Sequence, residues 1–363
     1  MEGFFKEKIN NMSKTIAKLT FEDGSVVDGE SFGYERSVAG EVVFTTGMVG
    51  YPESLTDPSY KGQILVFTYP LIGNYGVPDK KLWESDRIHT TAIIVSNYID
   101  EKSHHQAKQT LAEWLRDEKI PGIEITDTRA LTQKIREMGT MLGKIEFEKS
   151  VDWYDPNKEN LSALVSVAKP TTYRPSSTVR LRRAVLIDCG VKKNIIRSLV
   201  ARGVEVTVVP WNYDIETLQE KPDGVIISSG PGDPKIMKET IANVKKIVQA
   251  HIPTLGICFG NQILTLAVGG DTKKMKFGHR SQNQPCECHT QPGRFYLTTQ
   301  NHGFEVSKLP PGFKPWFTNV NDGIIEGIIH EKKPFMSVQF HPEACPGPTD
   351  TGWVFDYFLE RIV

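Results

Sequence analysis

The stretch Thr254-Leu255-Gly256-Ile257-Cys258-Phe259-Gly260-Asn261-Gln262 joins a short apolar run to a helix-like pattern that continues to Val268. A strand that ends at Ile257 and a helix that follows place Cys258 on the sharp turn between them, a nucleophile elbow. The glycines two positions before and after the cysteine leave room for its backbone. The helix amino terminus favours a thiolate, and the amide of Phe259 points at a developing oxyanion. The alternative is a buried structural cysteine, against which the glycines and the strand-to-helix context argue.

The same alternation of strands and helices surrounds this turn. Apolar runs at residues 184–188, 204–209 and 224–228 alternate with helix-like segments at 192–202 and 236–250. Such a pattern indicates a parallel sheet with helices on both faces, in which ligands bind at the carboxyl ends of the strands. We therefore expect a doubly wound, mainly parallel α/β domain with Cys258 at its ligand-binding edge.

The first half of the chain has a different texture. Short strand-like runs are separated by Pro, Gly, Asp and Ser, and helical stretches are expected at 110–117 and 128–138. This pattern predicts a mixed α/β module. The expected division is a polar tail (1–17), an amino-terminal module (18–150), a linker rich in turn residues (151–181) and the α/β domain (182–363).

The composition is that of an ordinary globular protein. The chain has 363 residues, enough for two domains, with 39% hydrophobic and 24% charged residues and a net charge of −1. No sustained basic run appears, which argues against nucleic acid or an anionic membrane as a partner. No apolar stretch is long enough to span a bilayer, the start lacks the apolar core of a signal peptide, and an odd count of 5 cysteines suggests free thiols. A cytoplasmic location is the expectation.

A second candidate group lies near the end of the chain. The tripeptide His341-Pro342-Glu343 follows a strand-like run at residues 335–339. Pro342 disfavours a helix at the preceding residue, and residues two apart in an extended segment point to the same side. Glu343 can then orient the ring of His341, which would take the thiol proton and later give it to the leaving amine. Alone, the tripeptide is typical of a surface loop; it gains weight from the cysteine elbow in the same domain.

Two further motifs have competing interpretations. The loop at residues 228–234, Ser-Ser-Gly-Pro-Gly-Asp-Pro, is either an ordinary turn or a substrate or oxyanion loop, and its place after a strand favours the latter. The run Cys286-Glu287-Cys288-His289 contains the residue types that bind zinc. Its Cys-x-Cys spacing and the lack of a second ligand pair argue against zinc, and we expect a solvated loop there and no metal.

Together these residues resemble a known family, the glutaminase small subunit or amino-terminal glutaminase region of carbamoyl phosphate synthetase. The elbow and the His-Pro-Glu are similar to the wider triad, or class I, amidotransferases. The narrower resemblance covers about residues 18 to 361 and is nearest to the pyrimidine-pathway enzymes of eukaryotes. It rests on residues 40–44, 50–51, 55–60 and 68–76 of the first half and on 208–211, 274–280, 283–285 and 300–304 of the second.

The resemblance implies a role for each matching residue. Cys258 would be the nucleophile, with His341 and Glu343 completing the triad. Phe259 and Asn261 stand where the family usually has Leu and His, a departure that leaves Gln262 in place. The implied contacts to L-glutamine are Ser59, Gly230, Gly232, Phe259, Gln262, Asn301, Gly303 and Phe304.

The implied function is hydrolysis of L-glutamine through a cysteinyl thioester, with delivery of ammonia to a synthetase partner. That partner, a large subunit or fused region, would make carbamoyl phosphate from bicarbonate, ammonia and two ATP for pyrimidine or arginine biosynthesis. ATP and a divalent metal are expected on the partner and no cofactor in this chain, which lacks a Gly-x-x-x-x-Gly-Lys-[Ser/Thr] loop. The alternatives are the glutaminase subunit of another synthetase and a non-catalytic regulatory subunit.

Overall fold

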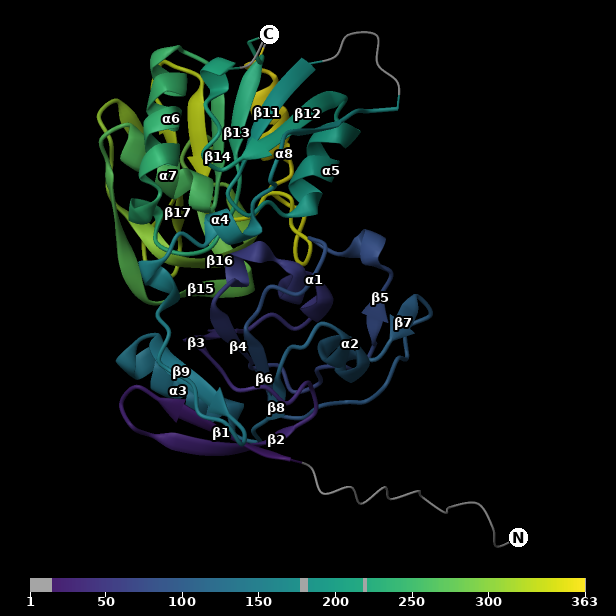
Figure 1. The fold of residues 1–363 in the computed structure, drawn as a ribbon. Helices are drawn as coiled ribbons and strands as arrows, with labels where there is room; N and C mark the ends of the chain where they lie inside the picture. Colours follow the sequence, from purple (N-terminus) through teal and green to yellow (C-terminus); the bar gives the residue numbers. More distant parts are fainter. Residues whose placement is uncertain (1–14, 177–181, 218–220, 363) are drawn as a thin grey trace, which may run out of the picture.

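The computed structural model describes residues 15–176, 182–217 and 221–362. Most of the expected polar tail and five residues of the expected linker lie outside these ranges. The described chain forms two bodies, a strand-rich barrel module and a larger α/β domain. They contact each other where β15 (Asp271–Cys288) of the domain packs against β3 (Val38–Thr45) and α3 (Thr128–Met138) of the module (Figure 1).

The barrel module is a closed barrel in which the described strands follow the order β1-β2-β8-β6-β4-β3-β9. Strands β3, β4, β6 and β8 pair with one another in parallel, whereas the pairings that involve β1, β2 and β9 are antiparallel. The strands are β1 (Ile16–Phe21), β2 (Val26–Ser31), β3 (Val38–Thr45), β4 (Gln63–Phe67), β6 (Ala92–Val95), β8 (Gly122–Glu124) and β9 (Met141–Glu146).

The module also contains three α-helices and a small two-stranded sheet among its described residues. The helices are α1 (Tyr51–Thr56), α2 (Leu111–Asp117) and α3 (Thr128–Met138), and β5 (Val77–Pro78) pairs with β7 (Ala107–Gln109). The two helices expected from the sequence are therefore confirmed. Helix α2 begins with a capping box, in which Thr110 and Glu113 satisfy each other's backbone amides.

The second domain is built on a mixed sheet with a parallel centre. The parallel strands are β12, β11, β13, β14 and β19, and antiparallel strands extend the sheet on both sides. The bounds are β10 (Thr171–Tyr173), β11 (Arg182–Asp188), β12 (Val204–Pro210), β13 (Gly224–Ile227), β14 (Thr254–Ile257), β15 (Asp271–Cys288), β16 (Phe295–Lys308), β17 (Phe313–Asn319), β18 (Ile325–His330) and β19 (Phe335–Val338).

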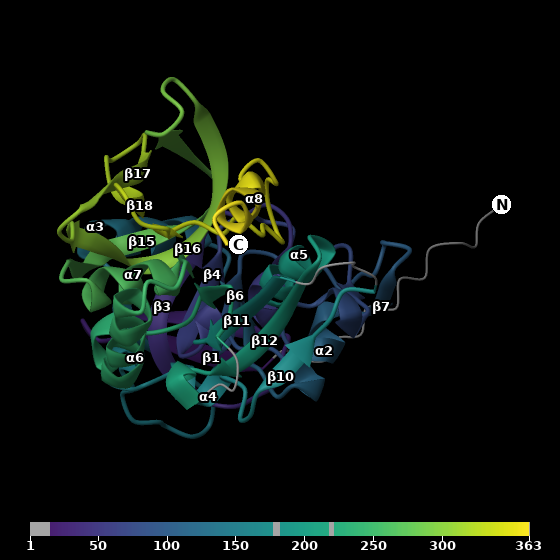
Figure 2. The same cartoon turned by 90° about the horizontal axis from the view of Figure 1, so that it is seen from above.

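Helices cover both faces of this sheet, as the alternating pattern predicts (Figure 2). Residues of α5 and α8 pack with Leu186 in one apolar cluster, whereas residues of α6 and α7 pack with Val185 and Ile187 in another. Neighbouring residues of β11 point to opposite faces of the sheet, and helices cover both faces. The strand therefore has an unbroken apolar run. The helices are α4 (Ser162–Val165), α5 (Lys193–Ala201), α6 (Lys238–Gln249), α7 (Phe259–Ala267) and α8 (Trp353–Leu359).

The structure differs from the sequence predictions in two places. The expected linker contains α4 and also β10, which pairs with β12 at the edge of the second sheet. The expected solvated loop around Cys286 and Cys288 is wrong, because both thiols are fully buried at the end of β15, where the strand pairs with β16 and β17. Alternating residues of a strand share one face, so Cys-x-Cys here is a core pattern.

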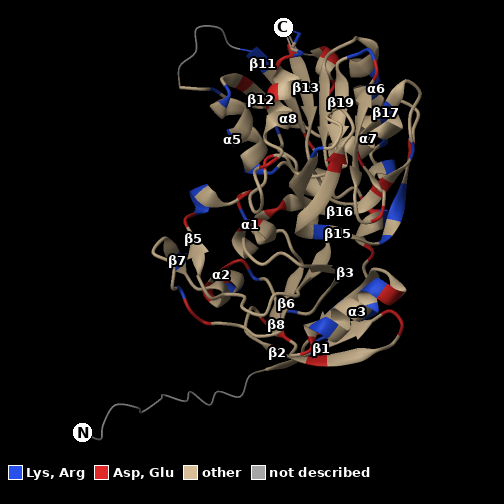
Figure 3. Cartoon of the chain, turned by 180° about the vertical axis from the view of Figure 1, so that it is seen from behind, with Lys and Arg blue, Asp and Glu red and all other residues tan. Residues whose placement is uncertain are grey.

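Charged residues are mixed over both bodies. Basic and acidic residues are interspersed along the elements of the barrel module and the second domain (Figure 3). Within the described ranges, no helix is long and apolar enough to cross a bilayer.

Candidate active site

Cys258 lies on a sharp turn between β14 and α7, at the carboxyl end of one of the parallel strands. Its backbone has φ 55° and ψ −102°, a conformation that a residue with a side chain adopts only at a cost of roughly 1–3 kcal/mol. The amide of Cys258 donates to the carbonyl of Val338 on β19 at 2.8 Å, which fixes the turn to the neighbouring strand. The predicted strand-turn-helix geometry is therefore present, and α7 begins directly after the cysteine.

The two glycines that flank this turn are required by close packing. A Cβ atom on Gly256 would lie 2.4 Å from the carbonyl oxygen of Gly260, and one on Gly260 would lie 2.1 Å from the carbonyl oxygen of Ile227. Both distances are far below van der Waals contact. The Gly-x-Cys-x-Gly spacing thus lets strand β13, the turn and the first turn of α7 approach one another.

His341 and Glu343 follow β19 and lie beside the cysteine. The ring Nδ1 of His341 is 2.6 Å from Oε1 of Glu343, and both side chains are buried. The other ring nitrogen, Nε2, is buried with no hydrogen-bond partner within the described chain. The contact between His341 and Glu343 that the sequence predicts is therefore present in the structure.

The charges around His341 favour its protonated form. Burial opposes the positive charge on the ring, but the charges of Glu343 and Cys258 outweigh burial and raise the pKa of His341 to about 10. Burial also opposes the charge on Glu343, yet Lys192 and His341 lower the pKa of Glu343 to about 2. The arrangement therefore supports an imidazolium next to the cysteine at neutral pH.

Lys192 is a component that the sequence interpretation missed. Its Nζ lies 3.1 Å from Oε1 of Glu343 and donates to the carbonyl of Ala344 at 2.6 Å, while the side chain is 2% exposed. Burial disfavours the charged lysine, but the nearby carboxylates of Glu343 and Glu84 raise its pKa above the usual value. Lys192 stands at the end of the loop after β11, beside Lys193, and a pair of lysines in a sequence is typical of a solvated surface.

Asn261, one of the two residues that depart from the family pattern, is held in a buried network. Its side chain accepts from the hydroxyl of Ser337 at 2.8 Å and donates to Oε1 of Gln339 at 2.8 Å. The Nε2 of Gln339 in turn lies 3.7 Å from Sγ of Cys258. Asn261 therefore ties α7 to β19 and helps to place an amide donor beside the thiol.

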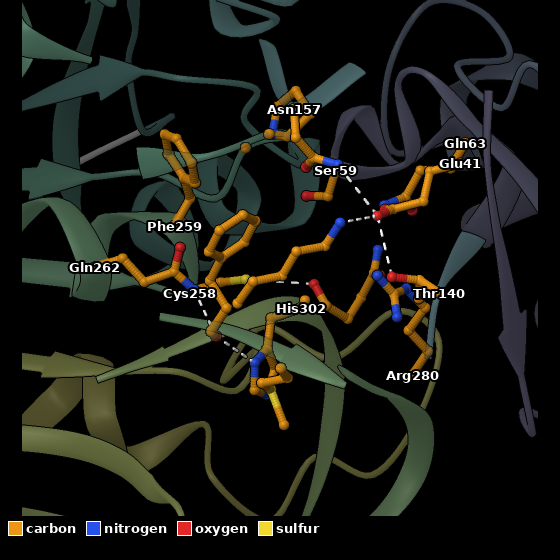
Figure 4. A pocket seen from close by; sticks show the side chains of 18 of the residues that line it. Glu41, Ser59, Gln63, Thr140, Asn157, Cys258, Phe259, Gln262, Arg280 and His302 are labelled. Carbon is orange, nitrogen blue, oxygen red and sulfur yellow. Dashed lines mark hydrogen bonds and ion pairs between the residues drawn. The ribbon is translucent and has the colours of Figure 1, made fainter. Parts of the chain in front are cut away.

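One pocket gathers the expected substrate residues at the junction of the two bodies. Ser59 approaches it from the barrel module, across from Cys258, Phe259 and Gln262 (Figure 4). The hydroxyl of Ser59 is buried and has no hydrogen-bond partner among the residues described. An unsatisfied hydroxyl in a pocket wall is available to a ligand. The pocket lining includes Cys258 and all eight residues assigned to L-glutamine by resemblance: Ser59, Gly230, Gly232, Phe259, Gln262, Asn301, Gly303 and Phe304.

The seam between the bodies is made of polar contacts around this pocket. The side-chain amide of Asn301 donates to Asp57 at 3.0 Å, and Asp57 also accepts from the amide of Ser59. Lys274 of the second domain also reaches the barrel module, where its Nζ lies 2.5 Å from the buried carboxylate of Glu41. The shape of the pocket therefore depends on the position of the two bodies relative to each other.

One group of side chains near the pocket has metal-ligand chemistry. His279, His302 and Glu326 bring ligand atoms within 4.8 Å of one another. Nδ1 of His279 is 3.0 Å from Glu326 and Nε2 is 2.8 Å from Asp322, while Nδ1 of His302 lies 2.9 Å from the carbonyl of Phe304. These contacts form a hydrogen-bond network that supports β16 behind the pocket. The prediction that this chain carries no metal or cofactor stays a prediction.

Two family models match the two bodies separately. Residues 185–361 match the class-I glutamine amidotransferase family, and residues 19–145 match the CPSase domain of the carbamoyl-phosphate synthase small chain. A putative GMP synthase protein of Thermoplasma acidophilum is similar to this structure with a TM-score of 0.44 and 24% identity, over 51% of this chain and 94% of that one.

Curated relatives are similar over nearly the whole chain. The multifunctional protein ura1 of Schizosaccharomyces pombe is 47% identical over 96% of this chain, and the multifunctional protein CAD of Squalus acanthias is 49% identical over 95%. The mitochondrial carbamoyl-phosphate synthase [ammonia] of Mus musculus is 48% identical over 98%. The chain spans 17%, 16% and 24% of the length of these three relatives, respectively.

Proposed function

Because the chain belongs to the class-I glutamine amidotransferases that carry the carbamoyl-phosphate synthase small-chain domain, we propose that it hydrolyses L-glutamine and supplies ammonia for carbamoyl phosphate synthesis. The observation that carries this proposal is Cys258 on its elbow, backed by His341 and Glu343 and facing a pocket that both bodies build. A thiol on a strained turn, a buried base and a polar pocket beside them are the parts that acyl transfer requires.

The reaction follows from the positions of these groups. The sulfur of Cys258 attacks the side-chain amide carbon of glutamine, and the developing oxyanion lies toward the amide of Phe259 at the start of α7. His341 gives a proton to the leaving nitrogen, so that ammonia departs and a γ-glutamyl thioester remains. Water, deprotonated by His341, then attacks the thioester carbon, the carbon–sulfur bond breaks, and glutamate leaves with the thiol restored.

The rest of the pocket would hold the amino-acid end of the substrate. Ser59 offers an unpartnered hydroxyl, and the loop with Gly230 and Gly232 offers main-chain groups at the carboxyl end of β13. A site designed to hydrogen-bond a polar substrate discriminates strongly against analogues that leave its buried groups unpaired. Asn301, Gly303 and Phe304 of β16 close the opposite side.

The ammonia would pass to a synthetase that uses bicarbonate and two ATP, either a large subunit or a region of a longer chain. The support is the small-chain domain at residues 19–145 and the much greater length of the multifunctional relatives. ATP and a divalent metal would bind to that synthetase. We place the pathway in pyrimidine biosynthesis first, with arginine biosynthesis as the other use, and the protein in the cytosol, although one relative is named as mitochondrial.

The proposed coupling is tested by adding the synthetase. Alone, the chain should release glutamate from L-glutamine slowly; with purified synthetase, ATP and bicarbonate its turnover should rise by more than about tenfold, or roughly 1.4 kcal/mol in barrier height. Full activity in isolation, unchanged by synthetase or ATP, would contradict the coupling and leave the hydrolase proposal standing. No glutamate release under either condition would contradict the hydrolase proposal itself.

A further inference from the structure

Helix α5 receives its amino-terminal cap from the other body of the protein. Within the described chain, the N-cap residue Lys192 makes no side-chain capping hydrogen bond. Instead, the amide of Asn194 donates to Oε2 of Glu84 at 3.1 Å, and the amide of Lys193 donates to the main-chain carbonyl of Glu84 at 2.7 Å. The first amides of a helix need such acceptors, and a carboxylate there also suits the helix dipole. A barrel-module residue thus fixes the first turn of a second-domain helix.

Glu84 is itself held rigidly in this position. Its side chain is fully buried, and Oε1 lies 2.9 Å from Nη1 of Arg197 on the same helix. Its own amide donates to the hydroxyl of Thr56 at the end of α1 at 3.0 Å. A buried carboxylate that loses its partners is strongly destabilising, so the barrel loop and α5 are fixed to each other.

The helix turn that Glu84 caps also holds the carboxylate of the triad. Lys192, just before the capped amides, places Nζ 3.1 Å from Oε1 of Glu343. Asn194, which donates its amide to Glu84, donates its side-chain nitrogen to the main-chain carbonyl of Glu343. The contacts therefore run without a break from Glu84 through residues 192–194 to Glu343, and from there to His341.

We propose that Glu84 is a positioning residue for the triad, through which the barrel module sets the geometry of Glu343 and His341. The inference rests on the proposed glutaminase activity and adds a route by which docking on the barrel module would alter catalysis. Glu84 is not one of the described residues that line the substrate pocket. Its loss should therefore affect turnover and leave substrate binding nearly unchanged.

The direct test replaces Glu84 with its neutral isostere. In the full chain, Glu84→Gln should lower kcat for glutamate release by roughly tenfold, or about 1.4 kcal/mol in barrier height, with KM unchanged within about twofold. The matched control is Asp86→Asn. It removes an exposed carboxylate that pairs with Nζ of Lys193, and this pair also joins the barrel module to the first turn of α5. The control should keep the wild-type kcat. A kcat of Glu84→Gln equal to that of an active wild type overturns the proposal, whereas an inactive wild type overturns the glutaminase assignment instead.

A double-mutant cycle separates positioning from general destabilisation. If Glu84 acts through the turn that carries Lys192, adding Glu84→Gln to Lys192→Met should lower kcat by less than about threefold, because coupled residues are non-additive. A full, additive loss in the double variant overturns the proposal.

The partly exposed Asn194 gives a second variant if Glu84→Gln does not fold, as judged by thermal unfolding. Asn194→Ala removes a hydrogen bond to the Glu343 carbonyl and should lower kcat several-fold with KM unchanged. A folded Asn194→Ala with wild-type kcat overturns the proposed route.

Discussion

The two bodies of the molecule contribute to one pocket in different ways. The second domain places a thiol, an imidazole and a carboxylate just after the carboxyl ends of the neighbouring parallel strands β14 and β19. The barrel module contributes polar side chains that reach across the seam, with Ser59 and Glu41 in the pocket wall and Asp57 bonded to Asn301. The comparison teaches that the thiol, the imidazole and the carboxylate belong to one sheet, while the pocket wall depends on how the two bodies meet.

The largest effect should come from the second domain's nucleophile. Cys258→Ser should reduce glutamate release to background, because a serine hydroxyl is a far weaker nucleophile at neutral pH. Carbamoyl phosphate synthesis from free ammonia, measured in the complex with synthetase, should survive. Glutaminase activity near the wild-type level would remove Cys258 from the mechanism and break the division between the bodies.

The base and its orienting carboxylate should come next, in that order. His341→Asn removes the proton carrier and should slow turnover by roughly 10²- to 10⁴-fold. Glu343→Gln keeps the base and should slow turnover less. Steady-state kcat for both variants checks the ranking, and negligible losses in both would show that this pair takes no part.

The pH dependence of kcat tests the electrostatic effect of Glu343 on His341. Burial lowers the pKa of His341, but the charges of Glu343 and Cys258 outweigh burial and raise it to about 10, so removing the charge of Glu343 lowers the pKa of the ring. The imidazolium of Glu343→Gln then loses its proton at a lower pH. The alkaline limb of kcat should therefore shift toward acid pH in this variant, and an unshifted or more alkaline limb would contradict the electrostatic role given to Glu343.

The smallest effect should come from Ser59, the proposed substrate contact of the barrel module. Ser59→Ala removes one neutral hydrogen bond, worth about 0.5–1.5 kcal/mol, and should raise KM for glutamine roughly 2- to 13-fold with little change in kcat. Thermal unfolding of the variant controls for folding. An unchanged KM would mean that the substrate does not reach across the seam.

The sequence was most informative where glycine spacing and strand-helix alternation restrict the backbone. The elbow at Cys258, the pairing of His341 with Glu343 and the parallel centre of the sheet follow from such local rules. The closure of the barrel and the antiparallel extension depend on long-range pairing, which no single segment reveals. Ser59 entered only through resemblance, because a lone serine before a tyrosine has no distinguishing pattern.

The sequence interpretation also missed polar residues that are buried in the structure. Lys192 is buried between carboxylates of two bodies, yet in the sequence it stands in a charged pair beside Lys193. Glu84 likewise looks like a surface acid near two lysines. Whether such groups are buried depends on partners more than 100 residues away, at Glu343 for Lys192 and at Arg197 for Glu84. Tertiary contacts decide these cases, and no local pattern predicts them.

The central claim is that glutamine is cleaved on Cys258, and trapping the acyl-enzyme tests it most directly. The chain would be incubated with isotopically labelled L-glutamine, quenched in acid, digested and analysed by mass spectrometry, with Cys258→Ser and Ser59→Ala in parallel. The account predicts a labelled glutamyl adduct on the peptide that contains Cys258, no adduct in Cys258→Ser, and an adduct in Ser59→Ala that needs more glutamine to form. Glutamate release without any adduct on Cys258, or an adduct on another residue, would contradict it.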